Sequence, residues 1–191
     1  MHDASPIHLP LKGVRVLEFE GIGPGPLAGS FLAGLGAHVT LVERPVATRQ
    51  PTAAVPNPLR DGKAIVPLDL KNPAGLQAAL DLVATHDVLI EGLRPGVMER
   101  LGLGPADCAQ RNPRLVYGRM TGWGQDGPLA QTAGHDLNYV ALTGLLSLSA
   151  RDGERPIVPP TLVGDATGAL GLAFGIVCGV LDVRAARLRT R

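Results

Sequence analysis

The sequence is poor in cysteine and carries no marked excess of charge. Its two cysteines, Cys108 and Cys178, lie far apart without metal-ligand spacing, which argues against a disulfide framework and a zinc site. Lysine and arginine number 18 against 17 acidic residues, so no overall field favours nucleic acid or an anionic membrane as a partner. The N-terminus lacks a basic segment followed by an apolar stretch. We therefore expect no metal, a reducing compartment and a cytoplasmic location.

The sequence also lacks an uninterrupted uncharged run long enough to span a membrane. Residues 166–181 hold sixteen uncharged residues between Asp165 and Asp182, whereas a spanning helix needs roughly eighteen or more. We expect a buried helix over 166–183 and no membrane span. Glycines that recur at every fourth position would form one smooth stripe, against which another helix or the sheet packs closely. They are Gly171, Gly175 and Gly179.

What the sequence does contain is an alternation of strand and helix patterns in 191 residues that are 45% hydrophobic, enough for one core. Strands are predicted over 14–19, 38–43, 64–70, 87–92 and 114–120, and helices over 26–36, 72–86, 95–101 and 105–110. Pro67 suits an edge strand. Residues 46–60 contain three prolines and predict a loop that folds over a ligand or stays mobile. The alternation predicts an α/β fold, a Rossmann-like, mostly parallel sheet with helices on both faces.

The stretch "GIGPGPLAG" after the first strand raises the question of a dinucleotide site, since Glu43 lies twenty positions beyond Gly23. A pyrophosphate needs free backbone N–H groups, and Pro24 and Pro26 have none. An NAD-dependent reductase is therefore disfavoured, and a tight strand-to-helix turn is an equal alternative. Fifteen of the 18 basic residues are arginine, and Arg44 is one that can receive a phosphate at the mouth of the sheet.

Two further segments contain residues suited to proton transfer. The segment "AGHDLNY" places His135 beside Asp136, and "LVGDATG" places Asp165 where the apolar helix begins. A carboxylate is favoured at a helix N-terminus, and exposed N–H groups there can hold an oxyanion. The structural alternatives are that His135 is simply hydrogen-bonded within a turn and that Asp165 caps a helix.

Several segments together resemble the class III CoA-transferase family, and within it the α-methylacyl-CoA racemases. The resemblance runs from about Leu11 to the end of the chain. Three segments are similar to the racemase branch in particular: "EGLRPGVMERLG", "RMTGWGQDGP" and "GHDLNY". Others are shared across the family, among them "LKGVRVLEFEGIGPGPLAGSFLAGLGAHVTLVERP", "LDLKNPAGLQ" and "RPIVPPTLVGDATG".

The resemblance implies an acyl-CoA site at the carboxyl ends of the strands. CoA is then part of the substrate, so no separate cofactor is expected. In that family, arginines after the second strand and in the "RPG" motif hold the CoA phosphates, which implies this role for Arg44 and Arg94. The family's "LDLK" segment lines the adenosine end and corresponds to Leu68, Asp69 and Lys71. On the residues alone, Arg94 reads as a surface residue and Lys71 as a solvated charge.

The same resemblance implies that His135 and Asp165 form a catalytic pair. Racemisation removes the proton next to the thioester carbonyl and returns one on the opposite face, so each side of the planar enolate needs an acid/base group. Backbone N–H groups near Asp165 are candidates for stabilising the enolate oxygen. In the same motif, Asp136 and Tyr139 are expected to orient His135 or to wall the site. Their structural alternatives are a helix cap and a core residue.

The chain departs from the family in length. Members of the family carry a second, smaller domain and form an interlinked dimer, and the glutamate that supports the catalytic histidine has no counterpart in residues 1–191. We therefore interpret the chain as the N-terminal part of the large CoA-binding domain, completed by a homodimer partner or a separate C-terminal half. Three functions stay open: a racemase, a CoA-transferase with Asp165 as nucleophile, and a non-catalytic module that binds CoA or a protein.

Overall fold

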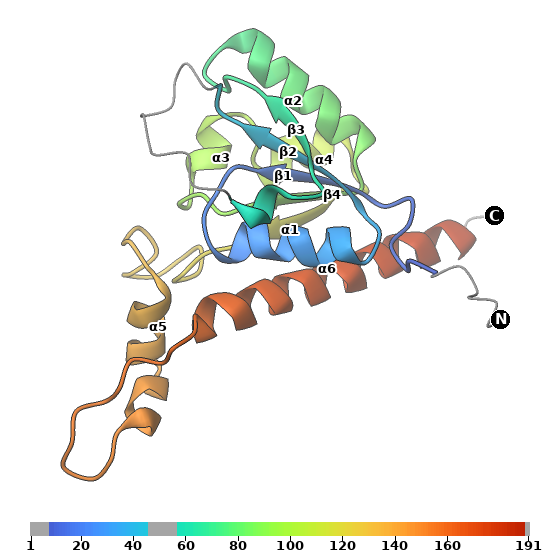
Figure 1. Cartoon of the computed structure of the whole chain (residues 1–191). Coiled ribbons are helices and arrows are strands. Elements are labelled where there is room, and N and C mark those ends of the chain that lie inside the picture. Colours follow the sequence, from blue (N-terminus) through green and yellow to red (C-terminus); the bar gives the residue numbers. More distant parts are fainter. Residues whose placement is uncertain (1–7, 46–56, 190–191) are drawn as a thin grey trace, which may run out of the picture.

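Five parallel strands form one sheet, which confirms the predicted α/β class. The computed structural model describes residues 8–45 and 57–189. The strand order is β3-β2-β1-β4-β5, and every neighbouring pair is parallel. Figure 1 shows the sheet with helices on both sides. The strands are β1 (Arg15–Phe19), β2 (His38–Glu43), β3 (Ala64–Pro67), β4 (Val88–Glu91) and β5 (Val116–Arg119).

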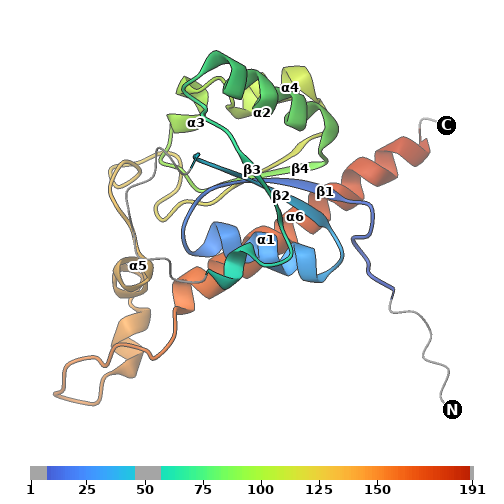
Figure 2. The same ribbon diagram turned by 45° about the horizontal axis from the view of Figure 1, so that its top comes forward.

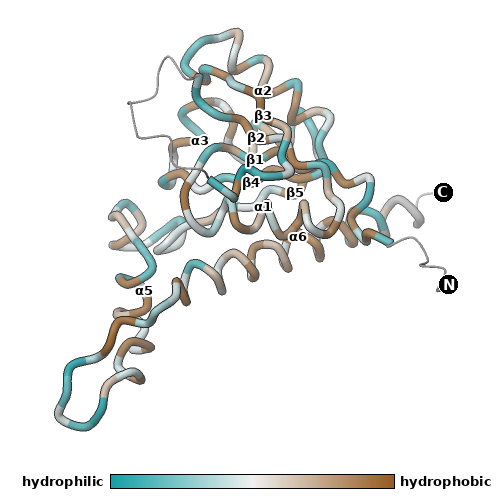
Figure 3. The backbone as a smooth tube through the Cα atoms, viewed as in Figure 1, coloured by the Kyte–Doolittle hydropathy of each residue, from teal (hydrophilic) through white to brown (hydrophobic). Residues whose placement is uncertain are grey.

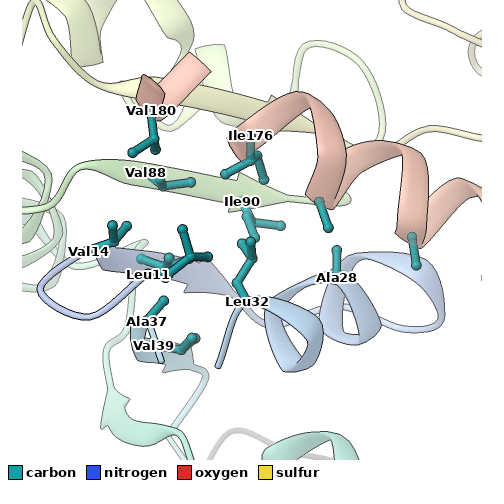
Figure 4. Close-up of a cluster of buried hydrophobic side chains, with 13 residues drawn as sticks. Leu11, Val14, Ala28, Leu32, Ala37, Val39, Val88, Ile90, Ile176 and Val180 are labelled. Carbon is teal, nitrogen blue, oxygen red and sulfur yellow. The ribbon is translucent and has the colours of Figure 1, made fainter. Parts of the chain in front are cut away.

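Alternation along the strands divides the core into two layers, because successive side chains point to opposite faces. On β1, Val16 joins one buried cluster while Leu17 and Phe19 join the other. The first cluster packs under α1 (Pro24–Gly34) and α6 (Val163–Arg189), as the side chains in Figure 4 show. The second packs under α2 (Pro73–Thr85), α3 (Val97–Arg100) and α4 (Pro105–Arg111). Figure 2 shows these two groups of helices on opposite sides of the sheet.

Local signals set the helix starts as expected. The Asn72 side chain accepts a hydrogen bond of 2.9 Å from the Ala74 N–H at the start of α2, and Pro73 occupies the first helical position. Strand β3 lies at the edge of the sheet, as Pro67 predicted, but it ends at Pro67, three residues before the predicted end. Within the predicted loop 46–60, a short 3₁₀ helix, η2 (Pro58–Arg60), forms, and residues 46–56 lie outside the described part.

Helix α6 corrects the prediction of a buried helix over 166–183. One face packs in the core, through Ala169, Ala173, Ile176 and Val180. The opposite face is open, and the Phe174 side chain is 71% exposed. Because nearly every residue of the run is apolar, the sequence pattern could not separate the packed face from the open one. Figure 3 shows that hydrophobic residues recur along the helix.

The length argument against a membrane span also needs correction. Helix α6 begins earlier than predicted, and by length and composition Val163–Ala186 could cross a membrane. In an 18-residue apolar stretch of this helix, 22% of the residues are buried.

The predicted glycine stripe packs closely at only part of its length. A β-carbon on Gly179 would lie 2.9 Å from Val116 of the sheet, whereas one on Gly171 or Gly175 would meet nothing within 4 Å. The sheet is thus approached closely at one of the three positions.

The chain segment between β5 and α6 forms an arm that extends from the body of the protein. It consists of α5 (Asp136–Leu142), η3 (Leu145–Ser149) and the connection that returns to α6, and both views show it pointing away from the sheet (Figures 1 and 2). Its apolar side chains are largely open, with Leu148 80% exposed and Leu142 65% exposed. The start of the arm, in contrast, lies at the end of the sheet where the site is found.

Candidate functional site

The loops that follow β1, β4 and β5 enclose a cleft of about 630 Å³ together with the starts of α5 and α6. All strands are parallel, so these loops meet at the carboxyl edge of the sheet. The strand order reverses between β1 and β4, and open α/β sheets bind ligands at such a point. The residues that carry the argument below line this cleft: Gly23, Arg94, Trp123, His135, Tyr139 and Asp165.

The glycine loop after β1 faces a carboxylate. Gly23 precedes α1 with φ 66°, and Pro24 begins the helix. A β-carbon at Gly23 would lie 3.0 Å from Oδ2 of Asp165. The positive φ and the close approach both favour glycine here. In this structure the loop therefore makes room for Asp165, as a strand-to-helix turn packed against the first turn of α6.

His135 and Asp165 come from different elements and line the same cleft. His135 is exposed and lies at the N-cap position of α5, where its backbone N–H donates to Asn138 Oδ1 at 3.0 Å. Asp165 lies in the first turn of α6. The sequence places them thirty positions apart, and the fold brings both to the ligand-sized space at the sheet edge. Their catalytic roles stay predictions.

Asp136 and Tyr139 both contact Asp165, and their expected role of orienting His135 stays a prediction. Asp136 is 9% exposed, and its Oδ1 accepts the Asp165 backbone N–H at 2.7 Å. The Tyr139 hydroxyl donates to Oδ1 of Asp165. Tyr139 also lines the cleft, in agreement with the alternative that it walls the site. The sequence could not reveal these contacts, because the partners lie 29 and 26 positions apart.

The donors available for an enolate oxygen are fewer than the sequence suggested. The Asp165 N–H is occupied by Asp136, so it is not free to bind an oxyanion. The Gly164 N–H has no acceptor within residues 8–45 and 57–189, and Gly164 lines the cleft. The Gly164 N–H is therefore the remaining candidate at this end of α6.

Trp123 is a site residue that sequence reasoning missed. It lines the cleft, and its ring meets the Tyr139 ring edge-on, with centroids 5.8 Å apart at 76°. Its Nε1 donates to the Ala133 carbonyl at 3.3 Å. The available signal was that the chain has a single tryptophan, within the segment "RMTGWGQDGP".

Burial raises the pKa of Tyr139, and the hydrogen bond of Tyr139 to Asp165 adds to the rise. The Tyr139 hydroxyl therefore remains a donor at neutral pH.

The two arginines proposed for CoA phosphates lie in different surroundings. Arg94 follows β4, lines the cleft and is exposed. Within the described part of the chain, its guanidinium makes no hydrogen bond or ion pair. Arg44 follows β2, and its side chain is 73% exposed, with Nε 3.4 Å from Glu20 Oε2. Only Arg94 is thus brought together with His135 and Asp165 around the cleft.

The "LDLK" segment follows β3, at the same edge of the sheet but outside the lining of the cleft. Leu68 is half-buried against the core on the α2 side. Asp69 and Lys71 are exposed, and the Asp69 carboxylate accepts the Lys71 backbone N–H at 3.0 Å. Arg44 and this segment therefore form the part of the edge beyond β1, separate from the residues around Asp165.

A buried ion pair beneath this edge was not anticipated. Lys63 Nζ lies 2.7 Å from Glu18 Oε2 and 2.8 Å from the Pro26 carbonyl oxygen. Burial raises the pKa of Glu18 to about 7, while Lys63 acts in the opposite direction. The pair connects β1, α1 and the segment before β3, so its role is structural.

Across residues 8–45 and 57–189 there is no group of three or more His, Cys, Asp or Glu side chains arranged to hold a metal ion.

Comparison with known proteins identifies relatives along almost the whole chain. The model of CoA-transferase family III matches residues 11–186. The human α-methylacyl-CoA racemase is 43% identical over 173 residues, which are 90% of this chain and 44% of the relative. A probable fatty acyl-CoA transferase of Mycobacterium tuberculosis is 40% identical over 184 residues, covering 90% of this chain and 46% of the relative.

Solved structures support the same relationship. A crystal structure of that mycobacterial protein superposes with a TM-score of 0.80 at 38% identity, covering 90% of this chain and 51% of the other. A CAIB/BAIF family protein from Brucella suis gives a TM-score of 0.82 at 28% identity, covering 96% and 51%. The chain therefore spans about half the length of the relatives that it matches. With the family model covering residues 11–186, the chain belongs to CoA-transferase family III.

Proposed function

We propose that this chain carries the CoA-binding and acid/base part of an acyl-CoA racemase, which inverts the 2-methyl centre of an acyl-CoA thioester. The observation that carries the proposal is that His135, just before α5, and Asp165, in the first turn of α6, line one cleft that Arg94 also lines. A ligand at the carboxyl edge can then meet a cationic anchor and two acid/base groups at once. The similarity to the human racemase favours this chemistry over others in the family.

The proposed reaction divides proton transfer between two groups. One removes the proton from the carbon next to the thioester carbonyl, and the other returns a proton on the opposite face. The reference pKa values of His and Asp, about 6.5 and 3.9, are far below that of a carbon acid, so stabilising the enolate oxygen must supply much of the rate. The Gly164 N–H is the donor that we assign to this task.

Binding of CoA is proposed to follow the edge of the sheet. Arg94 would hold a phosphate near the cleft, and Arg44 a phosphate beyond β2. Leu68, Asp69 and Lys71 would line the adenosine end. CoA enters as part of the substrate, so the proposal includes no separate cofactor.

Completion by further protein is also part of the proposal. The open face of α6 and the apolar arm leave side chains such as Phe174 and Leu148 exposed, and large exposed apolar patches are typical of interaction surfaces. We propose a homodimer or a complementing half of the enzyme as the cover, in the reducing setting of the cytoplasm. A module without catalytic activity remains the alternative for the chain when it stands alone.

A CoA-transferase is the second candidate, favoured by the similarity to the mycobacterial fatty acyl-CoA transferase. In that reaction the Asp165 carboxylate would attack the thioester and form an acyl anhydride as CoA leaves. The exposed His135 beside the same cleft has no evident task there, which favours the racemase.

Deuterium exchange distinguishes these candidates. The purified chain is incubated with a 2-methylacyl-CoA in D₂O, beside His135→Ala and Asp165→Asn variants, and deuterium at the α-carbon is measured by mass spectrometry. The racemase predicts exchange that both variants impair. A transferase instead predicts no exchange, transfer of CoA to an added carboxylate, and loss of that transfer in Asp165→Asn alone. CoA binding without either reaction would support the non-catalytic module.

A further inference from the structure

The surroundings of Tyr139 are more specific than a wall of the cleft requires. Its ring fits between two glycines: a β-carbon on Gly164 would lie 2.7 Å from the ring, and one on Gly122 would lie 3.3 Å from it. The Trp123 ring closes a third side, edge-on at 5.8 Å. These contacts fix the position of the ring and therefore of its hydroxyl group.

Asp165 is held at three points by this arrangement. Its backbone N–H donates to Asp136 at 2.7 Å, its Oδ1 accepts the Tyr139 hydroxyl, and its Oδ2 lies against Gly23. Asp136 and Tyr139 are three positions apart on α5, so they present to one side of the helix. Oδ2 is thus the carboxylate oxygen that Tyr139 leaves available.

We propose that Tyr139 is the positioning residue of Asp165, its hydroxyl holding one carboxylate oxygen so that the other meets the α-carbon of the acyl-CoA. This inference rests on the proposed racemase function. In a two-base reaction, each epimer of the substrate loses its proton to a different group. A residue that acts through Asp165 must therefore affect one epimer more than the other, whereas general damage to the fold affects both.

The chain offers a matched control, because it contains only two tyrosines. Tyr117 donates its hydroxyl to the Leu103 carbonyl oxygen at 2.8 Å and packs with the cluster on the α2 side of the sheet. Tyr139→Phe and Tyr117→Phe remove the same atom and with it the hydrogen bonds of that hydroxyl group. Tyr117 does not line the cleft, so its variant reports the effect of losing a tyrosine hydrogen bond elsewhere.

The first test measures initial deuterium exchange from each pure 2-methyl epimer. In Tyr139→Phe we expect kcat to fall about tenfold for the epimer that Asp165→Asn also impairs, as expected for losing a hydrogen bond to a charged group, with KM nearly unchanged. The other epimer and the Tyr117→Phe variant should exchange within about twofold of wild type. Equal losses for both epimers, or no loss, would overturn the proposal.

The second test does not depend on activity. With ¹³C-labelled aspartate, the Asp165 carboxyl resonance is assigned by its disappearance in Asp165→Asn. We expect this resonance to move in Tyr139→Phe and to stay in place in Tyr117→Phe. If wild type exchanges neither epimer, the racemase function fails, and the NMR result alone decides the role of Tyr139. A resonance unmoved in Tyr139→Phe refutes the positioning role in either case.

Discussion

Replacing Gly23 by alanine tests whether the loop after β1 fixes the Asp165 carboxylate. The substitution has a backbone effect, because Gly23 has φ 66° and ψ −122°, a conformation that L-residues rarely adopt and that costs about 1–3 kcal/mol. It also has a local effect, since the new β-carbon would lie 3.0 Å from Asp165 Oδ2. At that distance the carboxylate must retreat by a few tenths of an ångström. Because a misplacement of about 1 Å can cost roughly 100-fold, we expect a loss of about 3- to 10-fold in α-proton exchange.

The control is Gly13→Ala, which separates these two effects. Gly13 has φ 84°, and a β-carbon there would meet nothing within 4 Å. Urea titration should show a loss of unfolding free energy in both variants, about 1–3 kcal/mol, because both positions have a positive φ. Deuterium exchange, measured where both proteins are fully folded, should fall only in Gly23→Ala. Exchange at the wild-type rate in Gly23→Ala, or an equal loss in Gly13→Ala, would refute the reasoning.

Three further outcomes are expected. In Gly29→Ala the β-carbon would lie 1.8 Å from Glu18 Oε2. Disrupting the buried pair should lower the free energy of unfolding in urea titration by about 3 kcal/mol or more. The control Gly34→Ala, which has open space on the same helix, should be neutral or raise it by up to about 1 kcal/mol. Burial raises the Glu18 pKa from 4.5 to about 7, so its contribution to stability is full below 4.5 and is lost as pH rises through 7. Lys63 lowers the Glu18 pKa, so this pKa should lie higher still in Lys63→Met. The destabilisation in that variant should therefore grow as pH rises above about 7 in urea titrations, and a loss that stays constant above pH 7 would contradict this. Arg94→Ala should weaken CoA binding about tenfold by calorimetry, with unchanged affinity as the contrary result.

The sheet and its helices could be predicted because their signals are local. The largely apolar run of β2 predicted the observed bounds His38–Glu43, since a short apolar run and a preceding turn are signals that act within a few residues. The Asn72 and Pro73 signals marked the start of α2 for the same reason. The carboxyl edge as the place of the site was implied by the family resemblance, and it agrees with the general preference of parallel sheets for ligands at this edge.

The contacts around Asp165 could not be predicted, because they join segments through the tertiary fold. The sequence identified Asp136 and Tyr139 as companions of His135 by proximity along the chain, yet both contact Asp165. The pair of Lys63 with Glu18 spans 45 positions. A glutamate within the apolar strand β1 was nevertheless a usable signal, because a buried carboxylate requires a partner. The open face of α6 has no such signal in the sequence.

The spacing between His135 and Asp165, the two proposed acid/base groups, depends on how α5 packs against α6. His135 precedes α5, and the same helix supplies both side chains that contact Asp165. A β-carbon at Gly164 would lie 2.7 Å from the Tyr139 ring and 3.1 Å from Asp136 Oδ1, so glycine at this position allows the two helices to meet. Because α5 is also the base of the exposed arm, a protein surface that covers the arm would act on the helix that sets the spacing between His135 and Asp165. The proposed completion by further protein would in this way affect the geometry of the site.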